Sequence, residues 1–196
     1  MESVVFVRTY DAPAINKKEI FRYAGVRGSV EGLDSLVDEC IAEAKEVLAY
    51  KVCYREFWIL REGQGLDLGF CVTDSSDLGK NLEGCKSIVL FAATLGVGID
   101  RLIARYSAVS PAKALIFDAM GAERIEALCD EFCRDIEAEK GSVRPRFSAG
   151  YGDLPLELQK NIFEVLDAPR KIGLSLSESL VMSPSKSVTA IVGVVR

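Results

Sequence analysis

Residues 87–94 (SIVLFAAT) constrain the fold more than any other segment, because a short apolar run bounded by turn residues is typical of a buried strand. Gly96 and Gly98 follow it directly. They favour a tight turn from strand to helix over a phosphate-binding loop, since Arg101 replaces the third glycine of the dinucleotide fingerprint and no Walker lysine follows. The sequence therefore predicts a sheet in which this strand is buried.

Helical periodicity is found on both sides of this strand. Residues 34–50 carry apolar side chains on one face, and residues 99–139 repeat the pattern, with a break near Pro111 and a second candidate break at Gly121. A short helix is also expected over residues 155–166. Further strands are expected at four places: 51–61, 70–73, 172–180 and 187–195.

These elements do not alternate as regularly as the strands and helices of a doubly wound sheet. We therefore expect the α+β class, as a single domain over residues 1–196 with a mixed or antiparallel sheet flanked by helices. The chain has 196 residues and is 49% hydrophobic, so it can bury a core without disulfides. Its six cysteines are accordingly expected to be reduced, and the protein to be cytoplasmic.

Composition also limits the partners that the chain can have. The sequence contains no apolar run long enough to span a bilayer, and its first residues lack the pattern of a signal peptide, so we expect no membrane association. The formal net charge is −5, with acidic and basic residues interspersed. Without a basic stripe to neutralise phosphates, the chain is not expected to bind nucleic acid.

The sequence contains no histidine. This removes the commonest general base, the Ser-His and Cys-His nucleophile pairs, and the commonest ligand of zinc or non-haem iron. Cys129 and Cys133 lie four apart on an expected helix, but no second pair at zinc spacing exists, and we interpret them as buried, inert thiols. We therefore expect neither a catalytic residue nor a metal site.

The most informative loop is the stretch 144–153 (RPRFSAGYGD), which precedes the short helix. Arg146 could grip a carboxylate with two parallel hydrogen bonds. Gly150 allows the backbone to approach a ligand closely, and Tyr151 offers a flat face with a polar tip. Asp153 is expected to be the N-cap of the helix that follows. From these residues alone, a site for a small anionic or zwitterionic ligand and a purely structural turn fit equally well.

The same stretch resembles a known family. Residues 146–151 (RFSAGY) match the R-x-x-x-G-Y signature of the activation domain of cobalamin-dependent methionine synthase. Residues 171–179 (KIGLSLSES) are similar to that family's I-G-x-x-L-T-E-S strand, and residues 182–189 (MSPSKSVT) resemble its M-x-P turn and the strand after it. The helix between them (IFEVL, 162–166) also resembles the family's, and residues 123–127 (ERIEA) resemble its D-R-x-x-E-A helix more loosely.

The family motifs lie within residues 144–194, in order and with nearly the family's spacing, whereas residues 1–120 match the family less clearly. The resemblance implies a domain that binds S-adenosylmethionine. By this resemblance, Arg146 would hold the methionyl carboxylate, and the backbone around Ser148 and Gly150 would contact the ligand. Tyr151 would lie between the ligand and the corrin ring, and Glu126 would face a positive charge of the ligand.

The resemblance also implies partners. In the family, S-adenosylmethionine methylates a cobalamin that has oxidised to cob(II)alamin, with one electron from a flavodoxin or similar reductase. A chain without histidine lacks the D-x-H-x-x-G loop that usually holds cobalamin, so we expect the cobalamin on a partner methionine synthase and this chain as a separately encoded component of that activity. The alternatives are an activator of another corrinoid methyltransferase, or a docking subunit that does not bind S-adenosylmethionine.

Overall fold

The strand expected at residues 87–94 is β6 (Ser87–Thr94), and all of its residues are buried. In the computed structural model, which describes residues 4–28, 31–62 and 65–195, β6 lies between β2 (Tyr50–Trp58) and β9 (Ser187–Val194). β1 (Phe6–Tyr10) pairs with the other edge of β2. All three pairings are antiparallel, so the predicted α+β class is confirmed and the sheet is antiparallel. The ends of the expected domain, residues 1–3 and 196, lie outside the described residues.

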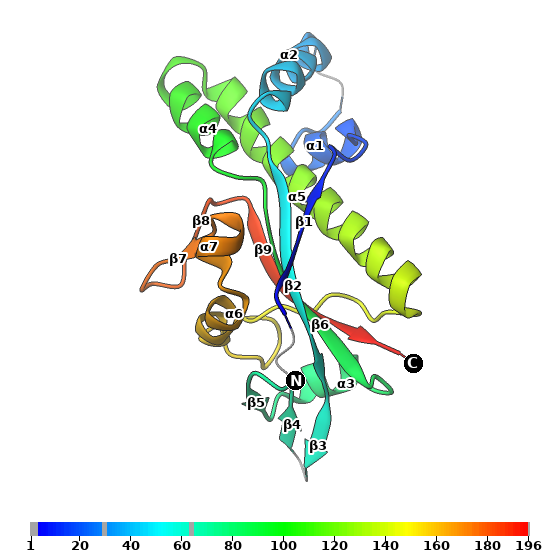
Figure 1. The fold of residues 1–196 in the computed structure, drawn as a ribbon. Helices are drawn as coiled ribbons and strands as arrows, with labels where there is room; N and C mark the ends of the chain where they lie inside the picture. Colours follow the sequence, from blue (N-terminus) through cyan, green and yellow to red (C-terminus); the bar gives the residue numbers. More distant parts are fainter. Residues whose placement is uncertain (1–3, 29–30, 63–64, 196) are drawn as a thin grey trace.

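Strands β6 and β9 are buried because helices cover both faces of the sheet (Figure 1), whereas the edge strand β1 is largely exposed. Successive side chains of a strand point to opposite faces. Val89, Phe91 and Ala93 of β6 therefore join one apolar cluster, with the second half of α5 (Pro111–Lys140). The alternate residues of the same strand join a second cluster on the opposite face, beneath α6 (Leu158–Leu166) and α7 (Ala168–Ile172).

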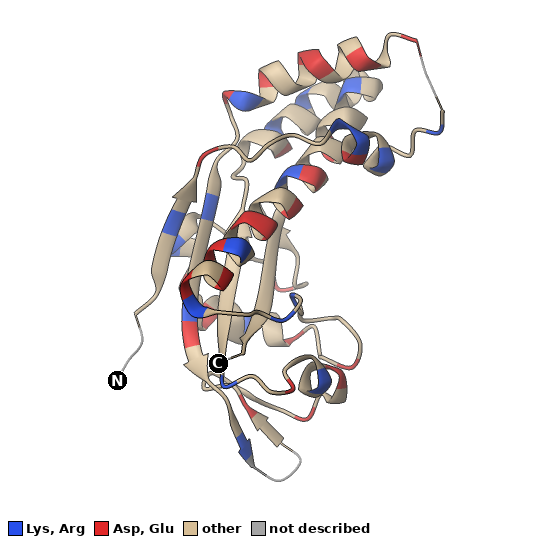
Figure 2. Ribbon diagram, turned by 90° about the vertical axis from the view of Figure 1, so that its right-hand side faces the viewer, with Lys and Arg blue, Asp and Glu red and all other residues tan. Residues whose placement is uncertain are grey.

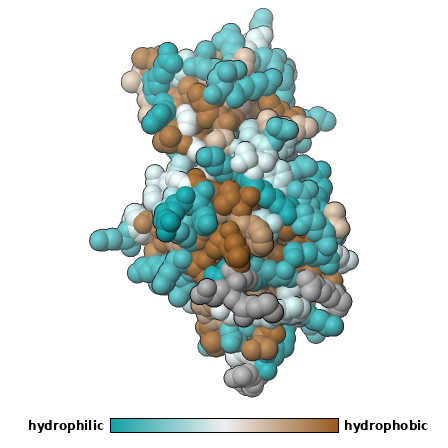
Figure 3. Space-filling view, in the orientation of Figure 1, coloured by the Kyte–Doolittle hydropathy of each residue, from teal (hydrophilic) through white to brown (hydrophobic). Residues whose placement is uncertain are grey.

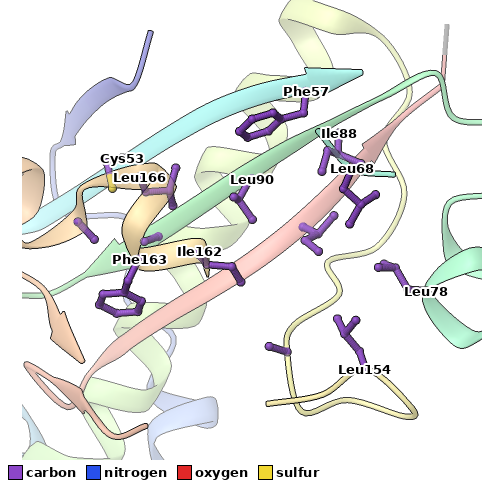
Figure 4. Close-up of a cluster of buried hydrophobic side chains, with 14 of the residues drawn as sticks. Cys53, Phe57, Leu68, Leu78, Ile88, Leu90, Leu154, Ile162, Phe163 and Leu166 are labelled. Atoms are coloured by element: carbon purple, nitrogen blue, oxygen red, sulfur yellow. The ribbon is translucent and has the colours of Figure 1, made fainter. Parts of the chain in front are cut away.

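Figure 4 shows the second cluster, in which side chains of α6 meet those of the strands. Ile162 and Leu166 are fully buried, and Phe163 is 7% exposed. These residues fall on one side of the helix, as expected for an amphipathic helix packed on a sheet. Leu78 and Leu154 extend the cluster from outside the sheet. They belong respectively to α3 (Ser76–Asn81), which the sequence did not predict, and to the loop before α6.

The first half of α5 lies beyond the sheet and is surrounded by other helices, at the top of Figure 1. These are α1 (Lys17–Tyr23), α2 (Leu33–Lys45) and α4 (Gly98–Val109), which share a third apolar cluster with α5. Figure 3 shows apolar side chains at the surface over this helical end and over the middle of the molecule. None of the helices in the described part of the chain is long and apolar enough to cross a membrane.

Helix α5 continues through Gly121, so the candidate break there was wrong. Gly121 is buried, and a Cβ atom built on it would lie only 2.8 Å from Cγ of Lys186. The glycine thus gives room for the stem of Lys186, whose ammonium group lies 2.8 Å from the carboxylate of Asp118 on the same helix. The predicted break near Pro111 is confirmed, because α4 ends at Val109 and Pro111 begins α5.

The strand expected over residues 172–180 is reduced to two residues. Pro169 lies in the first turn of α7, which continues to Ile172, and Gly173 ends this helix with φ of 72°. Only β7 (Ser175–Leu176) follows, paired antiparallel with β8 (Met182–Ser183). The pairing is short because the chain turns back between Ser177 and Val181, and the apolar residues Ile172, Leu174 and Leu176 pack in the cluster beneath α6 and α7.

A small separate sheet occupies the region between β2 and α3. It consists of β3 (Leu60–Glu62), β4 (Gly65–Asp67) and β5 (Val72–Thr73). The strand expected over residues 70–73 is therefore reduced to its last two residues. Residues 63–64, which lie between the strands expected at 51–61 and 70–73, are outside the described residues.

Candidate functional site

The segment after α5 runs along the free edge of β9 and leads into the loop that the sequence singled out. Arg144 donates its backbone N–H to the carbonyl of Gly193 at 2.8 Å. Phe147 and Ile191 exchange two backbone hydrogen bonds, of 2.9 and 2.8 Å. Arg146 lies between these two anchors. Its backbone is therefore held on either side, while its side chain reaches across to α5.

The guanidinium of Arg146 meets two carboxylates on α5. Its Nη2 atom donates to Oε2 of Glu126 at 2.9 Å and to Oδ1 of Asp130 at 2.8 Å. Burial alone would lower the pKa of Arg146, but the Cys129 thiol and the two carboxylates outweigh it and raise that pKa. Arg146 thus remains positively charged at any ordinary pH, and it is the only cation among the residues described as lining the pocket beside it.

This pocket has a volume of about 360 Å³ and lies between α5, the loop and the first half of β9. Four of the five site residues expected from the sequence line it. They are Glu126, Arg146, Ser148 and Tyr151. The side chain of Tyr151 is 67% exposed at the surface. The hydroxyl of Ser148 donates to the carbonyl of Thr189 at 2.8 Å, which ties the loop to the strand that forms the floor of the pocket.

Gly150, the fifth expected residue, lies in the same loop but is not among those that line the pocket. Its backbone has φ of 90°, a conformation that side-chain-bearing residues rarely adopt. Its N–H donates to the carbonyl of Leu154 at 2.9 Å, which closes a tight turn around Tyr151. In this structure, Gly150 therefore shapes the loop that carries Tyr151.

Sequence reasoning missed the other half of the pocket wall, which α6, β8 and β9 provide. Gln159 is 6% exposed, and its Oε1 lies 3.5 Å from the hydroxyl of Thr189. Met182 and Ser187 belong to the motif used for the family resemblance, so the sequence did contain a signal for them. Gln159 stands in an unremarkable helical pattern, and only the packing of α6 against β9 brings it to the pocket.

A second, larger pocket of about 460 Å³ adjoins the first, and Glu126 lines both. Its far wall is the extended segment before α1, which Arg124 holds in place. The fully buried guanidinium of Arg124 donates to the carbonyls of Pro13 at 2.5 Å and Ala14 at 2.8 Å, and it pairs with Glu123. Figure 2 shows acidic residues recurring along the second half of α5. The groove formed by the two pockets is therefore rich in carboxylates.

Asp153 does not cap the helix that follows it, as was expected. Its carboxylate caps α3, where it accepts hydrogen bonds from the hydroxyl of Ser75 and from the backbone N–H groups of Ser76 at 2.8 Å and Asp77 at 3.3 Å. The bond from Ser75, followed by these backbone donors, lowers the pKa of Asp153. α6 instead begins after a turn at Glu157, without a side-chain cap. The loop that carries Tyr151 is thereby attached to α3.

The two cysteines on α5 lie near the site; Cys129 is buried, as expected, whereas Cys133 is only partly buried. Burial raises the pKa of the Cys129 thiol to about 12 and that of Cys133 to about 11. Within the described residues, no group of three cysteine, aspartate or glutamate side chains is arranged to hold a metal ion. The groove presents guanidinium groups and several carboxylates, charges opposite to those of a ligand that carries both a carboxylate and a positive group.

Comparison with known proteins gives the family and the fold. The sequence matches the family described as vitamin B12 dependent methionine synthase, activation domain, over residues 75–194, which include all five expected site residues. No curated protein matches it significantly. The fold is similar to a solved structure described as the crystal structure of the MetH reactivation domain bound to AdoHcy, with a TM-score of 0.77 and 17% sequence identity. That similarity covers 98% of this chain and 78% of the other.

Proposed function

Because the chain belongs to the family of the vitamin B12-dependent methionine synthase activation domain, we propose that it binds S-adenosylmethionine at Arg146 and supports reductive methylation of a cobalamin held by a partner. The observation that carries this proposal is the contact between Arg146 and Glu126 inside one pocket. A guanidinium beside a carboxylate is the arrangement that an amino-acid ligand needs, since its carboxylate and ammonium groups can each find an opposite charge.

We assign the individual residues the roles that the family resemblance implies. Arg146 would bind the methionyl carboxylate, and Glu126 would face the ammonium or sulfonium group. The backbone near Ser148 would contact the ligand, while Gly150 would give the loop its turn. Tyr151 is exposed at the mouth of the pocket, where it would separate the bound ligand from a corrin ring presented by a partner.

The similar solved structure supports the choice of ligand. It is described as bound to AdoHcy, the product that S-adenosylmethionine becomes when it gives up its methyl group. The partner's cobalamin would supply the reduced cobalt that accepts this methyl group, after one electron from a flavodoxin-like or other reductant. The role of the chain is then to hold and orient the methyl donor, and such positioning needs no general base.

Calorimetric titration with S-adenosylmethionine tests the proposal. Wild-type protein should bind, and Arg146→Ala should lose about 2–5 kcal/mol of binding free energy, because the ligand carboxylate and two protein carboxylates then lack their cation. Arg144→Ala is the matched control. Arg144 belongs to the same edge segment, but its guanidinium donates to the carbonyl of Glu83 at 2.7 Å, outside the pocket. This variant should bind as the wild type does.

The outcomes separate the ligand from the site. If the wild type does not bind S-adenosylmethionine, the proposed function is wrong and a docking role without ligand is favoured. If the wild type and Arg146→Ala bind equally, only the site assignment is wrong. A cobalamin-carrying methionine synthase tested with and without this chain, under reducing conditions, then shows whether it is the partner; methylation of a different corrinoid protein instead would favour the alternative activator.

A further inference from the structure

The carboxylates around the two pockets are unequally balanced by arginines. Most acidic residues that line the larger pocket pair with an arginine of their own. These pairs are Glu19 with Arg22, Glu123 with Arg124, and Glu131 with Arg134. Arg146, in contrast, is paired with both Glu126 and Asp130. Among the described residues of this groove, the carboxylates therefore outnumber the arginines that pair with them by one. The extra carboxylate is one of the two that contact Arg146.

We propose that Asp130 makes this site prefer a ligand of net positive charge, S-adenosylmethionine, over the neutral product S-adenosylhomocysteine. The inference rests on the proposed function. S-adenosylmethionine carries a carboxylate, an ammonium group and a sulfonium group, and thus one positive charge in excess. Arg146, Glu126 and Asp130 together carry one negative charge in excess. The net charges of these side chains and of the ligand therefore cancel on binding.

The exposed fractions of Glu126 and Asp130 indicate which of them gives up its contact with Arg146 when the ligand carboxylate binds. The side chain of Asp130 is 64% exposed and that of Glu126 is 46% exposed, whereas that of Arg146 is 24% exposed. When the ligand carboxylate binds Arg146, Asp130 is the partner that can turn into solvent most easily. It stays within the range of Coulombic attraction and faces the groove as a second carboxylate, beside the one that Glu126 already provides.

Methyl transfer changes this balance. When the bond between the methyl carbon and sulfur breaks, its electron pair stays on the sulfur, and the sulfonium becomes a neutral thioether. The ligand then retains one ammonium and one carboxylate, which Glu126 and Arg146 alone can satisfy. The second protein carboxylate no longer has a cation to attract, so the product is held less strongly than the substrate. Asp130 thereby favours product release without contacting the reacting atoms.

Titrations of three proteins with both ligands test this inference. The wild type should bind S-adenosylmethionine more tightly than S-adenosylhomocysteine, and in Asp130→Asn this ratio should fall about three- to fivefold, the effect of one partly exposed charge. The control is Asp135→Asn, which removes the same charge from the same helix. Asp135 accepts a hydrogen bond from Tyr10 and pairs with Arg8, away from both pockets, so this variant should keep the wild-type ratio.

The salt dependence of the ratio between the two affinities distinguishes an electrostatic effect of Asp130 from a loss of packing, which salt would not change. Added salt should lower the wild-type ratio and affect the Asp130→Asn ratio less, because ions screen exposed charges. An unchanged ratio in Asp130→Asn, or equal binding of the two ligands by the wild type, contradicts this inference and leaves the proposed function standing. If the wild type binds neither ligand, the proposed function is overturned, and this inference with it.

Discussion

The carboxylate of Asp153 accepts a hydrogen bond from the backbone N–H of Ser76 at 2.8 Å, across 77 positions of the sequence. Asp153 follows Tyr151 and Gly152 directly, so the bond attaches the loop of the candidate site to the N-terminus of α3. Gly152 makes this contact possible, because a Cβ atom there would lie 2.5 Å from a carboxylate oxygen of Asp77. The position of the exposed tyrosine therefore depends on a helix that lies far outside the R-x-x-x-G-Y motif.

Asp153→Asn should lower the stability of the protein in a pH-dependent manner. The pKa of Asp153 is lowered in the folded protein, so its charge stabilises the fold above the unfolded-state pKa of about 4 and ceases to do so as the pH falls through the lower folded-state value. In urea unfolding, the free energy of unfolding of the wild type should exceed that of the variant at pH 7, and this difference should be smaller at pH 3. Asp74, which is exposed and directly precedes Ser75, provides the control Asp74→Asn. A difference that is the same at both pH values would contradict this prediction.

Gly98→Ala should destabilise the protein by about 1–3 kcal/mol, the usual cost of forcing an extra methyl group into a packed site. A Cβ atom on Gly98 would lie 2.2 Å from the backbone oxygen of Val47, in the turn that follows α2, and a backbone atom cannot give way as a flexible side chain can. Gly79→Ala in α3 is the counterpart, because no atom lies within 4 Å of its added Cβ. That variant should gain up to about 1 kcal/mol from helix propensity. Denaturant unfolding of both variants measures these two changes in the free energy of unfolding. A Gly98→Ala variant more stable than the wild type would refute the prediction.

Arg124→Met should cost about 3–5 kcal/mol of folding free energy, as expected when one member of a buried ion pair is removed. Arg124 is fully buried and Glu123 is 5% exposed, so the remaining carboxylate would be almost entirely buried without its cation. The double variant Glu123→Gln with Arg124→Met should recover part of this loss, because it no longer buries an unpaired charge. Thermal or urea unfolding of the single and double variants makes the comparison. A double variant less stable than Arg124→Met would show that the pair itself, and not the orphaned charge, dominates.

The buried thiols should be unreactive in the folded protein. Burial raises the pKa of Cys53 and Cys129 to about 12, so at pH 8 their thiolate fraction should be about three orders of magnitude below that of a free cysteine. Alkylation with iodoacetamide, followed by mass spectrometry, should therefore modify these residues only after unfolding. Cys71 and Cys133 are partly accessible and should be the first to react. Rapid modification of Cys129 in the native protein would contradict the buried position.

Local sequence patterns were sufficient to predict the elements that an apolar run or a proline marks clearly. The apolar run of β6 is confirmed at the expected residues, and so is the start of α5 at Pro111. The strand expected at residues 172–180 is only two residues long, because the apolar residues of this segment suit burial under helices as well as burial in a sheet. Gly121 was weighed as a break because glycine is a poor helix former, but the space that it leaves for Lys186 cannot be read from neighbouring residues.

The sequence by itself determined the family, the class of fold and the cation at the centre of the site, because Arg146 stands within an ordered set of local motifs. Only the tertiary structure decided what surrounds that cation. It brought Asp130 and Glu126 to Arg146 from α5, Gln159 from α6, and Asp153 to the distant start of α3. These relationships depend on how helices pack on an antiparallel sheet, and therefore on contacts between residues that lie far apart in the chain.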